Sequence, residues 1–163
     1  MLSLVTTLTG PTWMSVITGV VGFGWILLRR EWRRPLLLMG AMAVAVTASS
    51  LIKHELSRAR PDPAFMVLGL EPSPSFPSGH TLGSAVFALT LAWLLVAHSR
   101  RRTTTPARTA VVAFGLAALF AAVVGYSRIY LGYHWLTDVL ASAGLSLVVL
   151  AGVMAVDVWL SRR

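Results

Sequence analysis

Five long apolar segments constrain this chain more than any other feature of its sequence. They run over approximately Pro11–Leu28, Pro35–Ile52, Thr81–Ala97, Thr109–Tyr126 and Leu136–Leu160. Each has roughly 17 to 25 residues, enough for an α-helix to cross a hydrocarbon layer about 30 Å thick. The apolar runs are continuous and do not alternate, which favours helices over the strands of a β-barrel. The sequence therefore predicts an all-α, polytopic bundle of about five transmembrane helices.

The composition agrees with a membrane protein. Hydrophobic residues make up 56% of the 163 residues and charged residues 12%, whereas soluble domains are about 25% charged. We expect a single integral-membrane domain over residues 1–163, since this length suits one domain. Cysteine is absent, which excludes a disulfide framework, a thiolate metal site and a thiol nucleophile. The first segment lacks a preceding basic region and an Ala-x-Ala cleavage site, so we expect a retained helix and not a signal peptide.

The distribution of the 14 cationic residues sets the expected orientation. Ten belong to one set of connections: Arg29, Arg30, Arg33, Arg34, Arg100, Arg101, Arg102, Arg108, Arg162 and Arg163. The other set holds four: Lys53, Arg58, Arg60 and Arg128. Cytoplasmic loops carry the excess of Lys and Arg, so we expect the C-terminus in the cytoplasm and the N-terminus outside the cell membrane. Because such clusters beside apolar segments are topology signals, the net charge of +8 does not indicate a nucleic-acid partner.

Three of the four outer cations stand at expected helix ends and suit an anion. Arg60 and Arg128 offer planar donor forks that match phosphate oxygens, and Lys53 adds a point charge. Ser78 and Gly79 open the third apolar helix, where free backbone N–H groups and the helix dipole favour an anion. The sequence therefore predicts a site for the phosphate of a lipid headgroup at the outer membrane surface.

Two histidines add acid–base chemistry to this site. His134 and Asp138 are four residues apart, so on a helix they share a face and the carboxylate can hold the imidazole tautomer. An oriented histidine is a competent nucleophile or base, which leaves His80 as the acid. Two histidines and one aspartate could also mimic a metal site, but the nearby cations would repel a metal ion. His54 and Arg58 belong to the same outer region, and the pattern assigns neither of them a function.

The longest outer connection, Lys53–Pro77, contains an apolar stretch at Ala64–Leu70. This stretch is too short to span a bilayer. Two interpretations stay open: a loop over residues 62–76 that is packed on the protein, or a segment that dips into the membrane interface and guides a lipid.

Three spaced motifs resemble the signature motifs of the type 2 phosphatidic acid phosphatase superfamily, which also contains vanadium haloperoxidases and bacterial acid phosphatases. The motifs are Lys53-x6-Arg60-Pro61, Pro77-Ser78-Gly79-His80 and Ser127-Arg128-x5-His134-x3-Asp138. They extend over more than half of the chain, in the family's order. One departure is that membrane members usually have six helices, with three before the first motif, whereas two apolar segments precede it here. We expect that the first family helix is missing or that the chain begins late.

The resemblance implies metal-independent hydrolysis of a phosphomonoester or diphosphate without a cofactor. In the family pattern His134 is the nucleophile that forms a phosphohistidine, Asp138 orients it, and His80 protonates the leaving oxygen. The family pattern assigns phosphate binding to five positions: Lys53, Arg60, Ser78, Gly79 and Arg128.

We therefore expect a membrane lipid phosphatase of the cell envelope with its active site on the outer face. Its expected substrate is a phospholipid or polyprenyl phosphate: a polyprenyl diphosphate or monophosphate, phosphatidylglycerophosphate, or phosphatidic acid. The alternative is a non-catalytic membrane protein that binds anionic lipid headgroups. The intact histidines disfavour it, because binding alone needs only the cations. A haloperoxidase is a weaker alternative, since those relatives are soluble.

Overall fold

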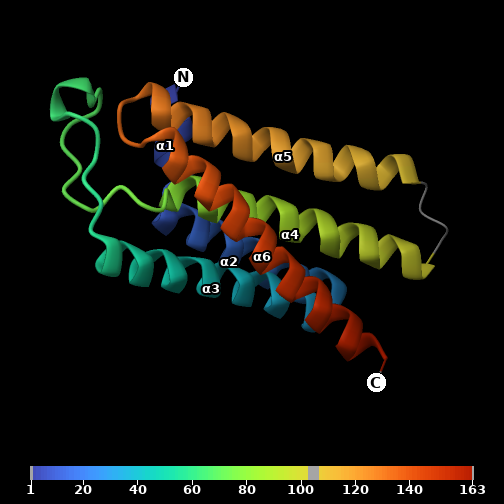
Figure 1. The fold of residues 1–163 in the computed structure, drawn as a ribbon. Coiled ribbons are helices and arrows are strands. Elements are labelled where there is room, and N and C mark those ends of the chain that lie inside the picture. Colours follow the sequence, from blue (N-terminus) through green and yellow to red (C-terminus); the bar gives the residue numbers. More distant parts are fainter. Residues whose placement is uncertain (1, 103–106, 163) are drawn as a thin grey trace.

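The computed structural model describes residues 2–102 and 107–162, which form helices and loops without strands (Figure 1). The elements are α1 (Leu2–Leu8), α2 (Pro11–Arg29), α3 (Arg33–Leu56), the 3₁₀ turn η1 (Pro63–Phe65), α4 (Gly79–Arg102), α5 (Ala107–Tyr130) and α6 (Leu136–Ser161). Five described helices, α2 to α6, are long and apolar enough to cross a membrane. The prediction of an all-α bundle with five spans is confirmed, and each predicted segment lies within one of these helices. Arg163, one of the ten counted cations, is outside the described residues.

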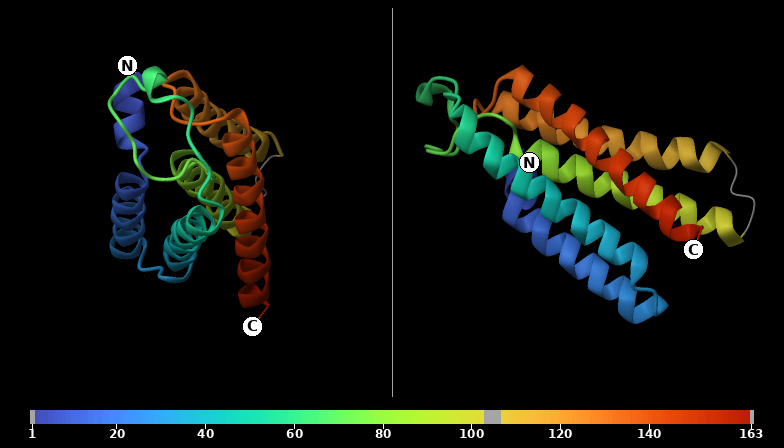
Figure 2. Two further views of the ribbon diagram at one scale, coloured as in Figure 1. Left: turned by 60° about the vertical axis from the view of Figure 1, so that its left-hand side comes forward. Right: turned by 60° about the horizontal axis from the view of Figure 1, so that its bottom comes forward.

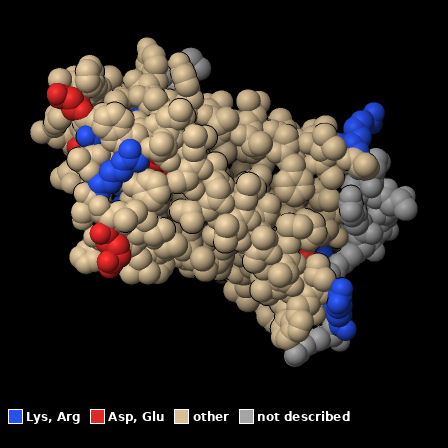
Figure 3. Space-filling model, viewed as in Figure 1, with Lys and Arg blue, Asp and Glu red and all other residues tan. Residues whose placement is uncertain are grey.

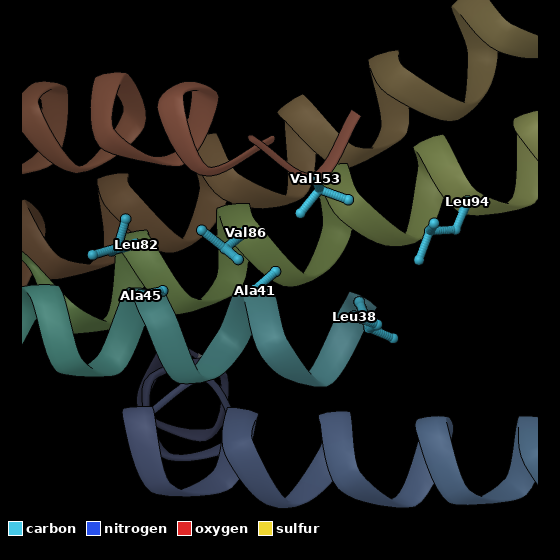
Figure 4. Packing of buried hydrophobic residues seen from close by; sticks show 7 residues of the cluster. All are labelled: Leu38, Ala41, Ala45, Leu82, Val86, Leu94 and Val153. Atoms are coloured by element: carbon cyan, nitrogen blue, oxygen red, sulfur yellow. The ribbon is translucent and has the colours of Figure 1, made fainter. Parts of the chain in front are cut away.

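Helix α4 is the centre of the bundle and contacts α2, α3, α5 and α6. About three-fifths of its apolar span is buried, against one third or less of each other span. Figure 4 shows the core between α3, α4 and α6, which consists of Leu38, Ala41, Ala45, Leu82, Val86, Leu94 and Val153. The alanines on α3 let the backbones of α3 and α4 approach closely, as small residues do between helices in a membrane. This packing fixes the position of the α4 N-terminus.

On the face shown in Figure 3, charged side chains lie at the two ends of the bundle and its middle is without them. Side chains such as Val20, Leu116 and Val148 are more than 60% exposed. Burial inside the protein therefore does not account for the apolar composition of α2, α5 and α6. Contact with lipid accounts for it, and the charged ends lie where a membrane would meet water.

The two ends of the bundle contain different connections (Figures 1 and 2). Helix α1, the 57–78 loop between α3 and α4, and the α5–α6 turn lie at one end, which we call the site end. The α2–α3 connection and the C-terminal end of α6 lie at the opposite end, which we call the far end. The sequence did not predict α1, because seven residues are too few to span a membrane. Its Thr6 is buried, with Oγ1 3.4 Å from Oγ of Ser127 on α5.

Candidate active site

The predicted site residues lie on elements that meet at the site end (Figure 1). The last turn of α3, the start of α4, the last turn of α5 and the start of α6 converge there with the 57–78 loop and the α5–α6 turn. In chain order they carry Lys53, Arg60, Ser78, Gly79, His80, Arg128, His134 and Asp138. The fold therefore brings all three motifs to one place.

His134 lies in the α5–α6 turn and contacts Asp138 in the first turn of α6. Its Nδ1 is 3.3 Å from Oδ2 of Asp138, as the four-residue spacing predicts. Its Nε2 is 3.3 Å from Nη1 of Arg60. Both distances are at the long end of the hydrogen-bonding range. Because arginine can only donate, these partners assign the ring proton to Nδ1 and the lone pair to Nε2. Nε2, the atom predicted to be the nucleophile, therefore faces a cation.

The surroundings of His134 keep its ring neutral. The ring is almost completely buried. The pKa of His134 is lowered to about 4, first by burial and then by the charges of Arg60, Arg128 and Lys53. The hydrogen bond with Asp138 acts in the opposite direction. At neutral pH the imidazole therefore keeps the free lone pair that a nucleophile or a base requires.

Asp138 is completely buried and uses both carboxylate oxygens. Besides its contact with His134, Oδ2 accepts the backbone N–H of Trp135 at 3.0 Å, which caps the start of α6. Oδ1 accepts a hydrogen bond from Nη1 of Arg58 at 2.7 Å. Arg58 is thus a site residue that the sequence pattern missed. The available signal was its place between Lys53 and Arg60 of the first motif.

Arg60 is held by acceptors of two loops. Its Nε donates to the carbonyl of Ser73 at 2.7 Å, Nη2 to Oγ of Ser73 at 3.0 Å, and Nη1 to the carbonyl of Tyr133 at 2.7 Å. Burial lowers the pKa of Arg60, while the charges of Glu71 and Asp138 raise it. The hydrogen bonds fix the guanidinium plane beside Nε2 of His134.

Arg128 and Lys53 are the other two predicted cations. Arg128 is 3% exposed, and its guanidinium carbon is 4.3 Å from the centre of the Tyr133 ring. Its Nε is buried without a hydrogen-bond partner among the described residues. Lys53 is half-buried in the last turn of α3 and donates to the carbonyl of Pro74. A buried donor without a partner is costly, and an anion bound in the site would supply one.

Ser78 and Gly79 open α4 at the predicted place. The N–H of Ser78 points to the carbonyl of Asp138 at 3.5 Å, so Gly79 and His80 carry the first N–H groups that lack an acceptor within the helix. A Cβ atom on Gly79 would lie 3.0 Å from Cγ of Pro11. Glycine therefore lets α2 approach the start of α4, which is a packing reason that the sequence did not indicate.

His80, in the first turn of α4, faces the N-terminal segment. Its ring hydrogen-bonds to the backbone of Thr6 in α1, and a Cβ atom on Gly10 would lie 3.6 Å from its Nε2. His80 is also close enough to Arg128 and His134 to interact with them electrostatically. The structure thus brings His80 to the same cluster and adds α1 as its neighbour.

Glu71 is a second residue of this cluster that the sequence pattern did not indicate. Its Oε1 accepts the N–H of Ser73 at 3.2 Å. Burial raises the pKa of Glu71, but the hydrogen bonds from Ser73 and the charges of Arg60 and Arg128 outweigh burial and leave this pKa below its ordinary value. A carboxylate that is ionised at neutral pH therefore stands among the cations.

The apolar stretch Ala64–Leu70 contacts the α5–α6 turn through its backbone. The hydroxyl of Tyr133 bonds to two backbone groups of this stretch, at 2.9 and 3.0 Å. Gly132 has φ +77°, and a Cβ atom there would lie 2.2 Å from the carbonyl oxygen of Phe65, so glycine is required. The side chains of Phe65 and Leu70 are 68% and 78% exposed. The backbone fits a packed loop, and the exposed side chains leave the interfacial interpretation open.

This arrangement suits nucleophilic chemistry on a bound anion. A neutral imidazole presents its lone pair beside a guanidinium, with two more cations and a helix N-terminus nearby. Among the described residues, no group of three or more His, Cys, Asp or Glu side chains could hold a metal ion.

Comparison with known proteins agrees with the motifs. The sequence model described as "PAP2 superfamily" matches residues 34–162, a range that contains every predicted site residue. Phosphatidylglycerophosphatase B of Bacillus subtilis (strain 168) is 30% identical over 162 residues, covering 97% of this chain and 74% of that protein. Undecaprenyl-diphosphatase of Sulfolobus acidocaldarius is 30% identical over 123 residues, covering 71% of this chain and about half (52%) of that protein.

Two solved structures are similar in fold. The transmembrane PAP2-type phosphatidylglycerolphosphate phosphatase from Bacillus subtilis superimposes with a TM-score of 0.82 and 29% identity, over 96% of this chain and 74% of that one. Aquifex aeolicus LpxE gives a TM-score of 0.56 at 21% identity, over 89% of this chain and 83% of that one, which shows a shared fold. Family match, relatives and fold lead to one conclusion: the chain belongs to the PAP2 superfamily.

Proposed function

We propose that this protein is an integral-membrane lipid phosphatase that hydrolyses a phosphomonoester or diphosphate through a phosphohistidine on His134. The observation that carries the proposal is the orientation of the His134 ring, with Nδ1 on Asp138 and Nε2 beside Arg60. The names of two relatives, phosphatidylglycerophosphatase B and undecaprenyl-diphosphatase, support a lipid-linked phosphate as substrate.

In the proposed first step, Nε2 of His134 attacks phosphorus while the bond to the leaving oxygen breaks. His80 donates a proton to that oxygen, so that an alcohol or a lipid monophosphate departs. Lys53, Arg60 and Arg128, with the free N–H of Gly79, would stabilise the charge on the remaining phosphoryl oxygens. Asp138 keeps the proton of His134 on Nδ1 and stabilises the positive charge that the ring acquires.

In the second step, water attacks the phosphohistidine. His80, now neutral, accepts the proton of the water, and the P–N bond breaks to release inorganic phosphate. His80 thus acts first as an acid and then as a base, as the reversal of a proton transfer requires. The cations supply the charge that a magnesium ion supplies in other phosphatases, so we propose that the reaction needs no metal.

An apolar groove supports a lipid as substrate rather than a water-soluble ester. A groove of about 460 Å³ lies between α4, α5 and α6, within their membrane-spanning parts. Leu89, Ala122 and Leu140 line it on the three helices, and Leu136 lines it close to the start of α6. A hydrocarbon chain would be buried in such a groove while its phosphate reached the site end.

Binding of anionic lipid without catalysis is the alternative function. The cations would suffice for it, but it gives no reason for a buried neutral histidine whose Nδ1 is fixed by a carboxylate. Such pairs are typical of catalytic sites. We therefore prefer the enzyme to the binding protein.

We propose further that the site end faces the outside of the cell membrane and the C-terminus lies in the cytoplasm, because the cations are concentrated in the connections of the far end. The chain has no cysteine, so single cysteines can report the orientation. An impermeant thiol reagent applied to intact cells should label Ala64→Cys in the 57–78 loop. It should not label Ala107→Cys at the start of α5 until the cells are opened. The reverse pattern would turn the site to the cytoplasm.

A substrate panel tests the function. Purified protein would be incubated in EDTA with phosphatidic acid, phosphatidylglycerophosphate, a polyprenyl monophosphate and a polyprenyl diphosphate, and released phosphate would be measured. We expect release from at least one of them, and inhibition by vanadate, whose trigonal-bipyramidal form mimics the transition state. No release from any of them, with tight binding to all, would favour the lipid-binding alternative. Activity that EDTA abolishes and magnesium restores would contradict metal independence.

A further inference from the structure

We infer that Arg58 is a positioning residue that fixes the carboxylate of Asp138 and, through it, the orientation of His134. The inference rests on the proposed function of His134 as nucleophile. The guanidinium of Arg58 contacts Asp138, Thr137 and the Trp135 ring and not His134, so the inferred action is on the geometry and the proton affinity of the proposed nucleophile.

Arg58 contacts three residues where α6 begins, Trp135, Thr137 and Asp138. Its Nη1 donates to Oδ1 of Asp138 and to Oγ1 of Thr137, both at 2.7 Å. Its guanidinium carbon is 5.9 Å from the centre of the Trp135 ring. The neighbouring carbonyl of Ala59 accepts the indole N–H of Trp135 at 3.0 Å. The loop after α3 is therefore attached to the first turn of α6 by a charged and a neutral contact side by side.

The division of the Asp138 carboxylate explains why Arg58 matters. Oδ2 serves both His134 and the N–H of Trp135, whereas Arg58 bonds to Oδ1. A carboxylate held at both oxygens cannot rotate about its Cβ–Cγ bond. Without Arg58, Oδ1 would lose its cation, which is unfavourable because the Asp138 side chain itself has no solvent exposure, although that of Arg58 is 39% exposed. Rotation to recover a partner would move Oδ2 away from His134.

Arg58 also influences the proton affinity of His134. Lys53 on α3, Arg60 in the loop, His80 on α4, Arg128 on α5 and Asp138 on α6 interact with His134 directly. Two further charged groups act through these residues: Arg58 through Asp138, and Glu71 through Arg60 and Arg128. Of these, Arg58 is the cation that forms an ion pair with Asp138. Its removal leaves the negative charge of Asp138 uncompensated, which favours a proton on the His134–Asp138 pair. The apparent pKa of the pair should therefore rise.

The test compares three variants with the wild type. Arg58→Gln removes both charge and fork, Arg58→Lys keeps the charge but loses the fork, and Thr137→Val removes the neutral partner of the same guanidinium. Two readouts are needed: kcat and KM against pH, and the titration of His134 by NMR of protein labelled with ¹⁵N-histidine. The chain has four histidines, so the His134 signal can be assigned by its loss in His134→Asn.

For Arg58→Gln we expect kcat to fall about 10- to 100-fold, the range found when an outer partner of a functional histidine is removed in metal sites. The His134 titration and the acid limb of kcat/KM should both move to higher pH by about one unit. Arg58→Lys should lower kcat with the titration near its wild-type position, and Thr137→Val should change neither by more than about twofold. KM should change less than kcat in both arginine variants.

A His134 titration in Arg58→Gln that stays at its wild-type position would overturn the inference, whether kcat falls or not. A contact that only stabilises the fold would lower the amount of folded protein without shifting this titration. If Arg58→Gln does not fold, an unchanged kcat in Arg58→Lys would overturn it. The NMR titration needs no turnover. If the wild type hydrolyses no lipid phosphate while the titration shifts as expected, the proposed function fails and the coupling of Arg58 to His134 stands.

Discussion

The cations predicted to bind phosphate at the site end and the buried ion pair at the far end have their charges compensated in opposite ways. At the far end, Arg33 donates to the carboxylate of Asp157 at 2.8 Å and to Oγ of Ser161 at 2.6 Å, and Asp157 is 2% exposed. At the site end, Lys53 and Arg60 donate mainly to backbone carbonyls, while Arg128 stacks on a tyrosine ring. None of these three cations forms an ion pair with a carboxylate in the described part of the chain.

Under the proposed function, this difference separates charge that stabilises the fold from charge that binds the substrate. A cation paired with a carboxylate on a neighbouring helix ties α3 to α6, and its charge is compensated within the protein. Cations held in place by uncharged acceptors keep most of their charge available to an external anion. Glu71 compensates part of this excess through the field it exerts on Arg60 and Arg128, and a bound phosphate would compensate the rest.

The largest effect that this comparison predicts follows from His134→Asn. Asparagine preserves polarity and approximate size but removes the nucleophilic nitrogen, so turnover should fall at least about 10⁴-fold. Released phosphate from the preferred lipid substrate measures it. The matched control is His54→Asn, an exposed histidine at the same end, which should retain activity. An active His134→Asn enzyme would rule out the proposed mechanism.

The next largest effect should come from His80→Ala and should depend on the substrate. General acid catalysis contributes about 10²–10⁴-fold, so hydrolysis of a lipid phosphate with an alcohol leaving group should fall by that factor. An activated aryl phosphate has a leaving group that needs no proton, so its hydrolysis should fall much less. The ratio of kcat values for the two substrates is the measurement. Equal losses would mean that His80 binds phosphate instead of donating a proton.

A smaller and more selective effect separates the two ends directly. Arg60→Lys keeps a charge but loses the fork, and the loss of a charge-assisted hydrogen bond worth about 1.5–3 kcal/mol should lower kcat/KM roughly 10- to 100-fold. Asp157→Asn at the far end should leave kcat/KM unchanged and lower the thermal unfolding midpoint, because it breaks a buried ion pair. Activity assays and melting curves on both variants give the comparison. A loss of kcat/KM in folded Asp157→Asn would mean that the far end also serves catalysis.

The sequence was sufficient for the elements whose signal is local. Apolar runs defined α2 to α6 to within a few residues. The four-residue spacing of His134 and Asp138 predicted the contact between their side chains. Helix α1 was missed because Leu2–Leu8 is short and its burial depends on tertiary contact, through Thr6, with α5.

The partners of long side chains could not be read from the sequence. Arg58 lies just after Ser57, whose left-handed φ of 42° turns the chain out of α3, and that turn decides which helix the guanidinium reaches. Glu71 and the Thr6 backbone beside His80 were missed for the same reason, since a loop and a short helix are positioned by the whole bundle. Gly79 was predicted for anion binding, whereas its visible constraint is the approach of Pro11.

The central claim is that His134 is the nucleophile that forms a covalent bond to phosphorus. Trapping the phosphoenzyme tests this claim most directly. The enzyme would be mixed rapidly with lipid substrate carrying ³²P in the transferred phosphoryl group and quenched in alkali, where a phosphohistidine survives. Peptide mapping would then locate the label. We predict label on His134 that appears before free phosphate, decays at the rate of turnover and is absent from His134→Asn. Turnover by the wild type with label on another residue, or with no label at any time before phosphate release, would contradict the account.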